Sequence, residues 1–432
     1  MNYSAALSVI SLYAGKLSGI AVSVFFLPIY GRILGPTLFG IVALFFSLQA
    51  LLMLIDVGAS TLVSRNAAAA DKSLGEQFRL LKTAEMTLGL LYSVLLGIAL
   101  LAAIITGHTS SHLLEAIIAV PCLLLLVLQN IYHSGLLGFK AYHRATVVQS
   151  LGLTTRALVT WLALQFISPS LLAFLLAQLI CTALHCWFTR KYLTACFCSI
   201  KTSAGDIRGE PGITLADCLS HIRRNRPLLL SGLVGAAAMQ LDKPLISTFI
   251  SAAAMAPYFL AVTLSAAPLA VLAAPLIQYF QPLLTGKVTQ AGSASYFESV
   301  RTAHLTVIAV TVTPMVLIYL LIEPICQAWL HGTGQAAMVA GYAKPLLLAY
   351  GIAAIGYIPF AIVTAQQDYK FQALLSTWAT GFILISTALA AAFHRIDLVC
   401  NAYIGYFSIS TIGLWIRSAS IHQRIRTSIP SS

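Results

Sequence analysis

Long apolar runs separated by short polar segments dominate the pattern along this chain. No Asp, Glu, Lys or Arg occurs between Lys243 and Lys287, and none occurs between Arg156 and Arg190. Each run is too long for one crossing of a bilayer, which takes about 20 apolar residues, and has the length of two crossings joined by a hairpin. Polar breaks inside the runs, such as Ser168–Ser170, supply the hairpins.

The remaining apolar runs, interpreted in the same way, predict twelve membrane-spanning helices. The predicted spans are 7–29, 37–58, 84–106, 113–137, 146–167 and 170–189, followed by 228–250, 254–276, 302–322, 338–363, 371–393 and 398–417. We therefore expect an N-terminal six-helix bundle (1–190), a cytoplasmic connecting segment (191–227), and a C-terminal six-helix bundle with a short cytoplasmic tail (228–432). Mixed apolar and charged residues at Thr61–Lys82 predict an interfacial helix between the second and third spans.

Composition supports an all-α polytopic membrane protein. The chain is 59% hydrophobic and 9% charged, with a mean hydropathy of +0.88, whereas soluble domains average about 45–50% apolar and about 25% charged residues. So few charges cannot cover a soluble protein of this size. A soluble enzyme, a nucleic-acid-binding protein and a disordered scaffold are excluded.

The basic residues predict the orientation in the membrane. If the N-terminus is cytoplasmic, the inner segments carry nearly all the Lys and Arg residues of the loops, and the outer loops carry only Arg32 and Arg395. Because basic loops stay on the cytoplasmic side, both termini are expected in the cytoplasm. The net charge of +12 is thus a signature of topology.

Four basic residues lie inside predicted spans: Lys16, Arg156, Lys243 and Lys344. A cation at the bilayer centre costs about 2.5–3.5 kcal/mol, so these side chains should face a hydrated interior, although Lys344 could also reach the interface. Asp242 is the only acid well inside a span, and its neighbour Lys243 should point about 100° away from it on a helix. The expected excess of positive charge favours an anionic substrate.

The chain lacks the common motifs of catalysis, metal binding and ATP hydrolysis. It contains no Walker A sequence, no HExxH pattern, no Gly-x-Ser-x-Gly turn and no CxxC pair. We therefore expect no enzyme activity, no catalytic residues, no metal site and no cofactor. Energy would come from a proton or sodium gradient, or from downstream consumption of the transported molecule. Asp242 is a candidate either for coupling to such an ion or for a structural ion pair with Lys16 or Arg156.

Several short motifs resemble those of polysaccharide flippases, the Wzx-type O-antigen and capsule translocases of the multidrug/oligosaccharidyl-lipid/polysaccharide exporter superfamily. The resemblance covers the length of the chain, its span count and its central loop. The motif residues are Gly35 and Gly40 after the first span, Asp56, Gly58 and Arg65 after the second, the Asp242–Lys243 pair in the seventh, and Tyr258 opening the eighth. Ala256–Pro257 replaces the glycine usual before that tyrosine.

The resemblance implies two six-helix bundles around a central cationic cavity. It implies alternating-access translocation of undecaprenyl-pyrophosphate-linked oligosaccharides across the bacterial inner membrane, for O-antigen, capsule or exopolysaccharide synthesis. A polysaccharide polymerase and a chain-length regulator are the implied protein partners. A lateral portal is expected near Gly19, Ser23 and Ala267, where small residues allow close helix approach.

Two alternatives remain open. A cation-coupled multidrug or small-molecule exporter of the same superfamily would favour acidic residues in its cavity. A membrane glycosyltransferase or polymerase would need a large outer loop with catalytic residues, whereas the largest predicted outer loop, about Glu323–Ala337, contains one Glu and one His.

Overall fold

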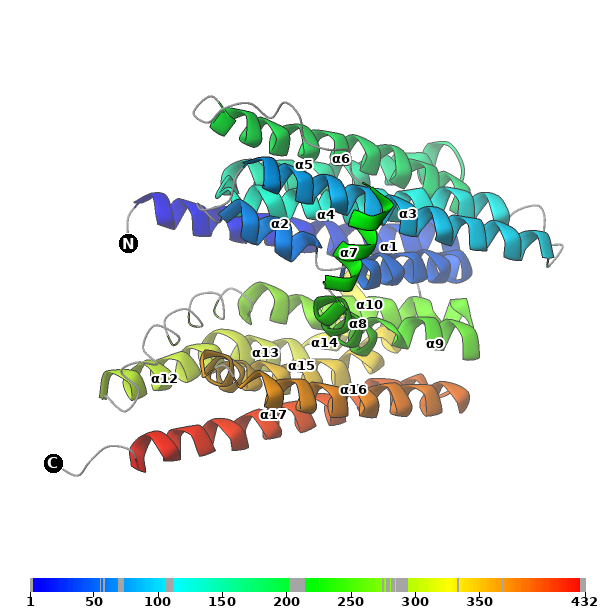
Figure 1. Cartoon of the computed structure of the whole chain (residues 1–432). Helices are drawn as coiled ribbons and strands as arrows, with labels where there is room; N and C mark the ends of the chain where they lie inside the picture. Colours follow the sequence, from blue (N-terminus) through cyan, green and yellow to red (C-terminus); the bar gives the residue numbers. More distant parts are fainter. Residues whose placement is uncertain are drawn as a thin grey trace. The chain divides into compact units, whose positions relative to one another are not determined.

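The structure, a computed structural model, describes residues 3–54, 56, 59–68, 74–105, 112–201, 214–224, 226–273, 276, 280, 284, 294–331, 334–366 and 368–427. These residues form helices and no strand (Figure 1). They fall into two compact units, Met1–Ala236 and Ala237–Ser432. The all-helical membrane fold expected from the sequence is confirmed.

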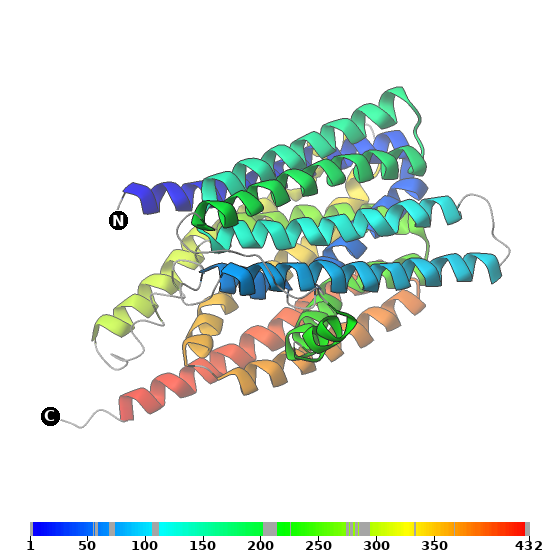
Figure 2. The same cartoon turned by 45° about the horizontal axis from the view of Figure 1, so that its top comes forward.

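The first unit is built from α1 to α7 and most of α8. Their bounds are α1 (Tyr3–Leu54), α2 (Ala59–Ala68), α3 (Leu74–Ile105), α4 (His112–Gly138), α5 (Tyr142–Phe166), α6 (Leu171–Lys201), α7 (Leu215–Arg224) and α8 (Arg226–Gln240). Helices α5 and α6 pack against each other, and α6 also packs along α4 (Figure 2). A turn at Ser168–Ser170 joins α5 to α6, as the polar break predicted.

The first two predicted spans meet at Gly35, within α1. Gly35 has φ 72° and ψ 171°, so the backbone leaves the helix there. A side chain disfavours that conformation, whereas glycine adopts it readily, and Pro36 follows with no main-chain donor. Helix α1 therefore comprises two helical segments, consistent with separate spans at 7–29 and 37–58.

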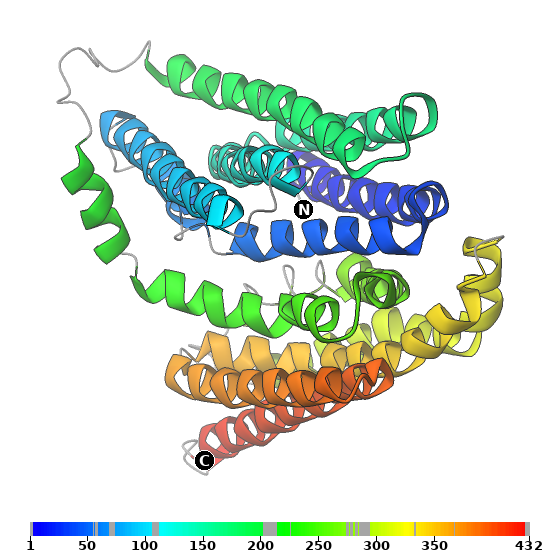
Figure 3. The same ribbon diagram turned by 90° about the vertical axis from the view of Figure 1, so that its right-hand side faces the viewer.

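The second unit contains α9 (Asp242–Phe249), α10 (Ala252–Pro268), α12 (Ala294–Val307), α13 (Thr313–Leu320), α14 (Ile322–Trp329), α15 (Ala336–Ala365), α16 (Tyr369–Ala392) and α17 (Ile396–Thr427). Two π-helical segments, η1 (Leu269–Ala273) and η3 (Ile308–Val312), continue α10 and α12. Helix α17 packs along both α15 and α16 (Figure 3).

All twelve predicted spans correspond to helical segments. Ten helices in the described residues are long and apolar enough to cross a membrane, and one of them, Leu17–Met53, covers the first two predicted spans. The predicted span 228–250 consists of α8 and α9, which are separated by a break at Leu241. The chain is a multi-pass membrane protein.

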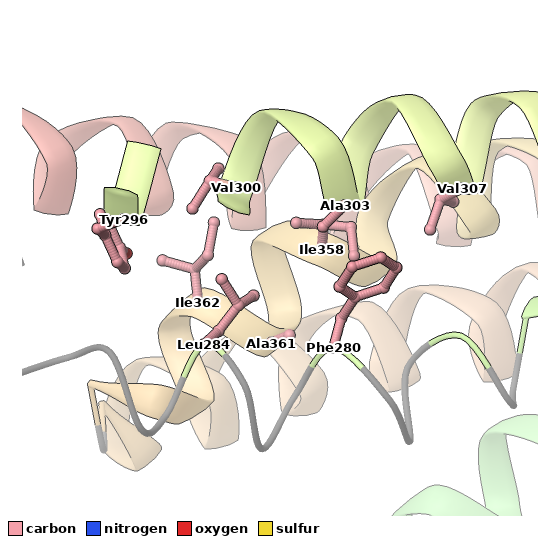
Figure 4. Packing of buried hydrophobic residues seen from close by; sticks show 9 residues of the cluster. All are labelled: Phe280, Leu284, Tyr296, Val300, Ala303, Val307, Ile358, Ala361 and Ile362. Carbon is pink, nitrogen blue, oxygen red and sulfur yellow. The ribbon is translucent and has the colours of Figure 1, made fainter. Parts of the chain in front are cut away.

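A cluster of buried apolar side chains shows how α12 is held in the second unit. Tyr296, Val300, Ala303 and Val307 lie on one face of α12 at helical spacing. They pack against side chains of α15 that include Ile358 and Ile362, and against Phe280 and Leu284 (Figure 4).

The prediction of one interfacial helix over Thr61–Lys82 was wrong. Helix α2 ends at Ala68 and α3 already begins at Leu74. Helix α2 instead packs on α4, where a Cβ added to Gly138 would lie 2.4 Å from the carbonyl oxygen of Ser64. Within both helices, residues such as Val63, Asn66 and Gln77 are buried.

Helix α7, in the predicted connecting segment, is tied to α3. Asp217 and Thr214 form a reciprocal cap at its start, since Asp217 Oδ2 accepts from Thr214 N at 2.9 Å and Thr214 Oγ1 accepts from Asp217 N at 3.3 Å. Arg79 of α3 donates to Asp217 Oδ1 at 3.1 Å. The main-chain and hydroxyl hydrogen bonds from Thr214, with Arg79 nearby, hold the pKa of Asp217 below its usual range.

Candidate functional site

Asp242 lies at the break between α8 and α9. It is the first residue of α9, and its side chain is 2% exposed. The adjacent Lys243 folds back, so that its Nζ donates to Asp242 Oδ1 at 2.8 Å and to Oδ2 at 3.1 Å. The same ammonium group donates to the carbonyl oxygen of Met239 at 2.9 Å, which belongs to the last turn of α8.

Two buried tyrosines complete the shell of the Asp242 carboxylate. Tyr258 of α10 and Tyr403 of α17 both donate hydrogen bonds to Oδ2, the latter at 2.8 Å. We call Asp242, Lys243, Tyr258 and Tyr403 the Asp242 cluster. It joins three helices of the second unit around a compensated charge pair.

The expectation that Asp242 and Lys243 would not face each other was wrong. That expectation assumed a continuous helix and considered only the directions in which side chains leave it. The helix breaks at Leu241, and the lysine has four methylene groups with which to reach its neighbour's carboxylate. Asp242 is therefore paired within its own unit, with Lys243.

Lys344 is also paired. Its Nζ lies 2.6 Å from Glu323 Oε1, and the two side chains are 40% and 62% exposed. Glu323 belongs to α14, whereas the sequence analysis placed it in a loop. The expected surplus of embedded positive charge was therefore overestimated, because acids at helix ends compensate part of it.

Arg156 is enclosed by the first unit. The residue is 9% exposed. The groups close enough to interact electrostatically with its guanidinium include Tyr30 of α1, Cys122 of α4, and Cys181 and His185 of α6. Tyr30 donates a hydrogen bond to the neighbouring carbonyl oxygen, that of Ala157, at 2.8 Å. Among the residues that the structure describes, no carboxylate lies within salt-bridge range of Arg156.

Helix α6 presents a buried polar stripe that the sequence analysis missed. Gln178, Thr182, His185 and Thr189 are all at most 5% exposed and recur at helical spacing. Gln178 donates to Thr160 Oγ1 of α5 at 3.1 Å. Within the described residues, Gln178 Oε1, Thr182 Oγ1 and His185 Nε2 are buried without a hydrogen-bond partner. In the sequence, the signal for this stripe is the recurrence of polar residues at helical spacing inside an apolar run.

Gly152 allows α5 to approach this stripe closely. A Cβ added there would lie 2.4 Å from three atoms of the His185 ring. Thr155, Cys181 and His185 also line a mostly apolar cavity of about 310 Å³ between α5 and α6. Close packing at Gly152 and an adjoining cavity thus occur side by side along the polar stripe.

The other motif residues lie in varied environments. Gly40 is buried in α1. Asp56 is 4% exposed, and its Oδ2 accepts from Ser60 N at 2.9 Å, which caps the start of α2. Gly58 and the side chains of Lys16 and Arg65 lie outside the described residues.

The structure gives the local contacts of Gly19 and Ser23, and the helix that carries Ala267. Ser23 donates to the carbonyl oxygen of Gly19 at 3.0 Å, and a Cβ on Gly19 would contact Leu153 of α5 at 3.4 Å. Ala267 lies in α10. The portal and the central cavity stay predictions.

A family model described as polysaccharide biosynthesis protein matches residues 6–285. The chain belongs to this family. The resemblance to polysaccharide flippases inferred from the motifs is thereby confirmed at the level of the family. No curated protein matches the sequence.

Solved structures with low sequence identity to this chain share its fold. The lipid II flippase MurJ in an inward closed conformation has a TM-score of 0.69 at 16% identity, covering 98% of this chain and 90% of that one. A MATE transporter in complex with MaL6 has a TM-score of 0.65 at 14% identity, covering 98% and 97%. A MOP-superfamily transporter from Pyrococcus furiosus, described as having a binding pocket of reverse polarity, has a TM-score of 0.58 at 15% identity, covering 97% and 96%. This member of the polysaccharide biosynthesis family therefore has the fold of these transporters and of the MurJ flippase.

Proposed function

We propose that this chain flips polyprenyl-pyrophosphate-linked oligosaccharides across the bacterial inner membrane for O-antigen, capsule or exopolysaccharide synthesis. The family supports a role in polysaccharide biosynthesis. The fold supports passage of a polar headgroup through a protein interior while the lipid tail stays in the bilayer. The two units would alternate between inward and outward openings by rocking against each other.

The observation that carries the proposal is the burial of Arg156 without a carboxylate partner in the described residues. A buried, uncompensated charge is costly and is seldom retained for stability alone. A pyrophosphate would supply the missing negative charge, and the planar guanidinium suits bidentate hydrogen bonds to its oxygens. We assign Arg156 as the principal headgroup contact.

The other embedded cations take different roles in this proposal. Lys16 remains a candidate headgroup contact. Lys243 stabilises the seventh span through Asp242, and Lys344 acts at the opposite face of the cargo, on its sugars. A carboxylate already bound to a lysine and two tyrosines suits a structural role better than cation coupling, which disfavours the alternative of a cation-coupled drug exporter.

The remaining expectations form part of the same proposal. Transport requires no covalent step, so we propose neither enzyme activity nor a bound cofactor. A proton or sodium gradient, or consumption of the flipped substrate, would supply the energy. The polymerase and the chain-length regulator are the proposed partners, and both termini are proposed to be cytoplasmic.

Genetic complementation tests the transport role. A strain lacking the gene should lose its surface polysaccharide, and wild-type protein should restore it. Arg156→Gln should insert and accumulate but fail to restore the polysaccharide, whereas Arg156→Lys should restore it only in part. Arg144→Gln is the matched control, because Arg144 lies on the same helix and is exposed. Full restoration by Arg156→Gln would contradict the assigned role.

Cysteine labelling tests the orientation. Ser220 of α7 and His331 after α14 are both exposed. In a variant without native cysteines, Ser220→Cys should resist a membrane-impermeant maleimide in intact cells, and His331→Cys should react. The opposite pattern would invert the topology.

A further inference from the structure

Two polar cavities adjoin in the second unit, near the start of α15. One, of about 290 Å³, lies between α14 and α15, and the other, of about 350 Å³, lies between α15 and α17. Gly341 and Lys344 of α15 line both cavities. Their volumes are close to the lower limit of the range for small-molecule pockets, about 300–1,000 Å³.

The walls on either side of α15 repeat the same chemistry. Helix α14 carries Glu323 and Gln327, and α17 carries Asp397 and Asn401. In both cases a carboxylate is followed four residues later by a carboxamide, so the two groups share one face of their helix. The two faces flank Lys344.

The two wall carboxylates are each paired with a cation, whereas the two side-chain amides have no hydrogen-bond partner among the described residues. Glu323 accepts from Lys344 at 2.6 Å, and Asp397 accepts from Arg395 at 2.6 Å and 2.9 Å. In the part of the chain that the structure describes, the side chain of neither Gln327 nor Asn401 forms an intramolecular hydrogen bond, although both residues are exposed and line the cavities. Each amide thus offers unused donors and an unused acceptor.

These walls cannot face hydrocarbon. Lys344 lies about 12 Å along α15 from Ala336 at 1.5 Å per residue, and its ion pair is half-exposed. Charged and amide groups exposed at that depth require a hydrated surface. In the topology favoured by the loop charges, this surface opens to the outside.

Neutral, hydroxyl-rich ligands match this set of groups best. The paired charges leave no strong net field for an anion or a cation, while carboxylate oxygens, amides and an ammonium group together donate to and accept from hydroxyls. Tyr319, which lines the second cavity, adds an aromatic ring against which the apolar face of a pyranose can pack.

We propose that these two adjoining cavities form a saccharide-binding site on the exit side of the second unit. The inference rests on the proposed function, because it assigns the site to the sugars of the flipped cargo. Arg156 would bind the pyrophosphate and this site the glycan. The glycan would thus be held by hydrogen bonds in a site whose charges balance, apart from the cationic contact of Arg156.

Binding of free sugars to the full-length protein in nanodiscs tests the site directly. The probes are common neutral hexoses, N-acetylhexosamines and hexuronic acids, with glycerophosphocholine as a lipid-headgroup probe, measured by saturation-transfer NMR. At least one sugar should bind, and Asn401→Leu and Gln327→Leu should each weaken it about tenfold or more, the factor expected for one lost hydrogen bond of about 1.4 kcal/mol. Gln423→Leu, at the far end of α17, should bind as wild type.

Several outcomes would overturn the proposal. They are binding of no sugar, binding that survives both Asn401→Leu and Gln327→Leu, and binding of glycerophosphocholine alone. The proposed function fails separately, if deletion of the gene leaves surface polysaccharide unchanged. Sugar binding that Asn401→Leu abolishes would support the site even then.

Discussion

The Asp242 cluster makes a quantitative prediction about stability. Asp242→Asn retains the shape of the side chain but removes its charge, which leaves the Lys243 ammonium group 4% exposed without a counter-charge. Removing one partner of a buried ion pair costs about 3–5 kcal/mol. At about 2–4 °C per kcal/mol for a domain of 150–250 residues, the unfolding midpoint of the second unit should fall by about 6–20 °C.

Cysteine reactivity can report this unfolding. The second unit contains Cys326 and Cys400, both fully buried, so replacing the six other cysteines confines the signal of a thiol-reactive dye to this unit. Heating the detergent-solubilised protein then gives the midpoint. Asp368→Asn is the control, because Asp368 pairs with Arg417, whose side chain is 31% exposed, and this substitution should cost no more than about 1 kcal/mol.

The double variant Asp242→Asn/Lys243→Met separates charge from packing. It removes both charges and keeps a side chain of similar length at position 243, so most of the lost stability should return. The reasoning is refuted if Asp242→Asn unfolds within about 2 °C of wild type, or if the double variant is no more stable than the single one.

Three further predictions concern other contacts. Tyr403→Phe removes one hydrogen bond to the same carboxylate and should cost about 1.5–3 kcal/mol in that unfolding assay; no loss would mean that the bond is absent. Gly152→Ala places a Cβ 2.4 Å from the His185 ring and should destabilise the first unit by about 1–3 kcal/mol, whereas Gly89→Ala, with nothing within 4 Å, should not destabilise it. Because hydrogen bonds lower the pKa of Asp217, its contribution to α7 docking is fully present above the ordinary aspartate value of about 3.9 and is lost as the pH falls through the lower value. The protection of the α7 amides against hydrogen exchange, relative to the intrinsic rate at each pH, should therefore stay constant from pH 7 to about 4, and a loss of protection well above that pH would contradict the assignment.

The spans could be predicted from the sequence because lipid imposes a simple rule. A crossing needs about 20 apolar residues with all main-chain groups paired internally, so runs without charge predict helices. The break at Gly35 was also accessible, since Gly–Pro commonly interrupts a helix. The charge-free runs and the Gly–Pro break together predict twelve spans.

The pairing of the embedded charges was not accessible in the same way. The Asp242–Lys243 contact depends on a helix break at Leu241. Pro244, in the first turn of α9, marks this break in the sequence, but the pattern does not give the directions of the two side chains after it. Lys344 meets Glu323 because the turn after α14 folds the chain back, which requires tertiary structure. The surroundings of Arg156 come from α1, α4 and α6 and depend on packing across the whole unit.

A reconstituted translocation assay tests the central claim most directly. Liposomes would contain the protein and a polyprenyl-pyrophosphate-linked oligosaccharide with a fluorescent sugar, and an impermeant quencher would report its passage between leaflets. Wild type and Arg144→Gln should flip the lipid at equal rates, while Arg156→Gln should be slower by about 10–100-fold, the loss expected for one charge-assisted contact. Because that substitution removes an uncompensated buried charge, its unfolding midpoint should equal or exceed that of wild type. Wild-type rates for Arg156→Gln, or no flipping by the wild-type protein, would contradict the account.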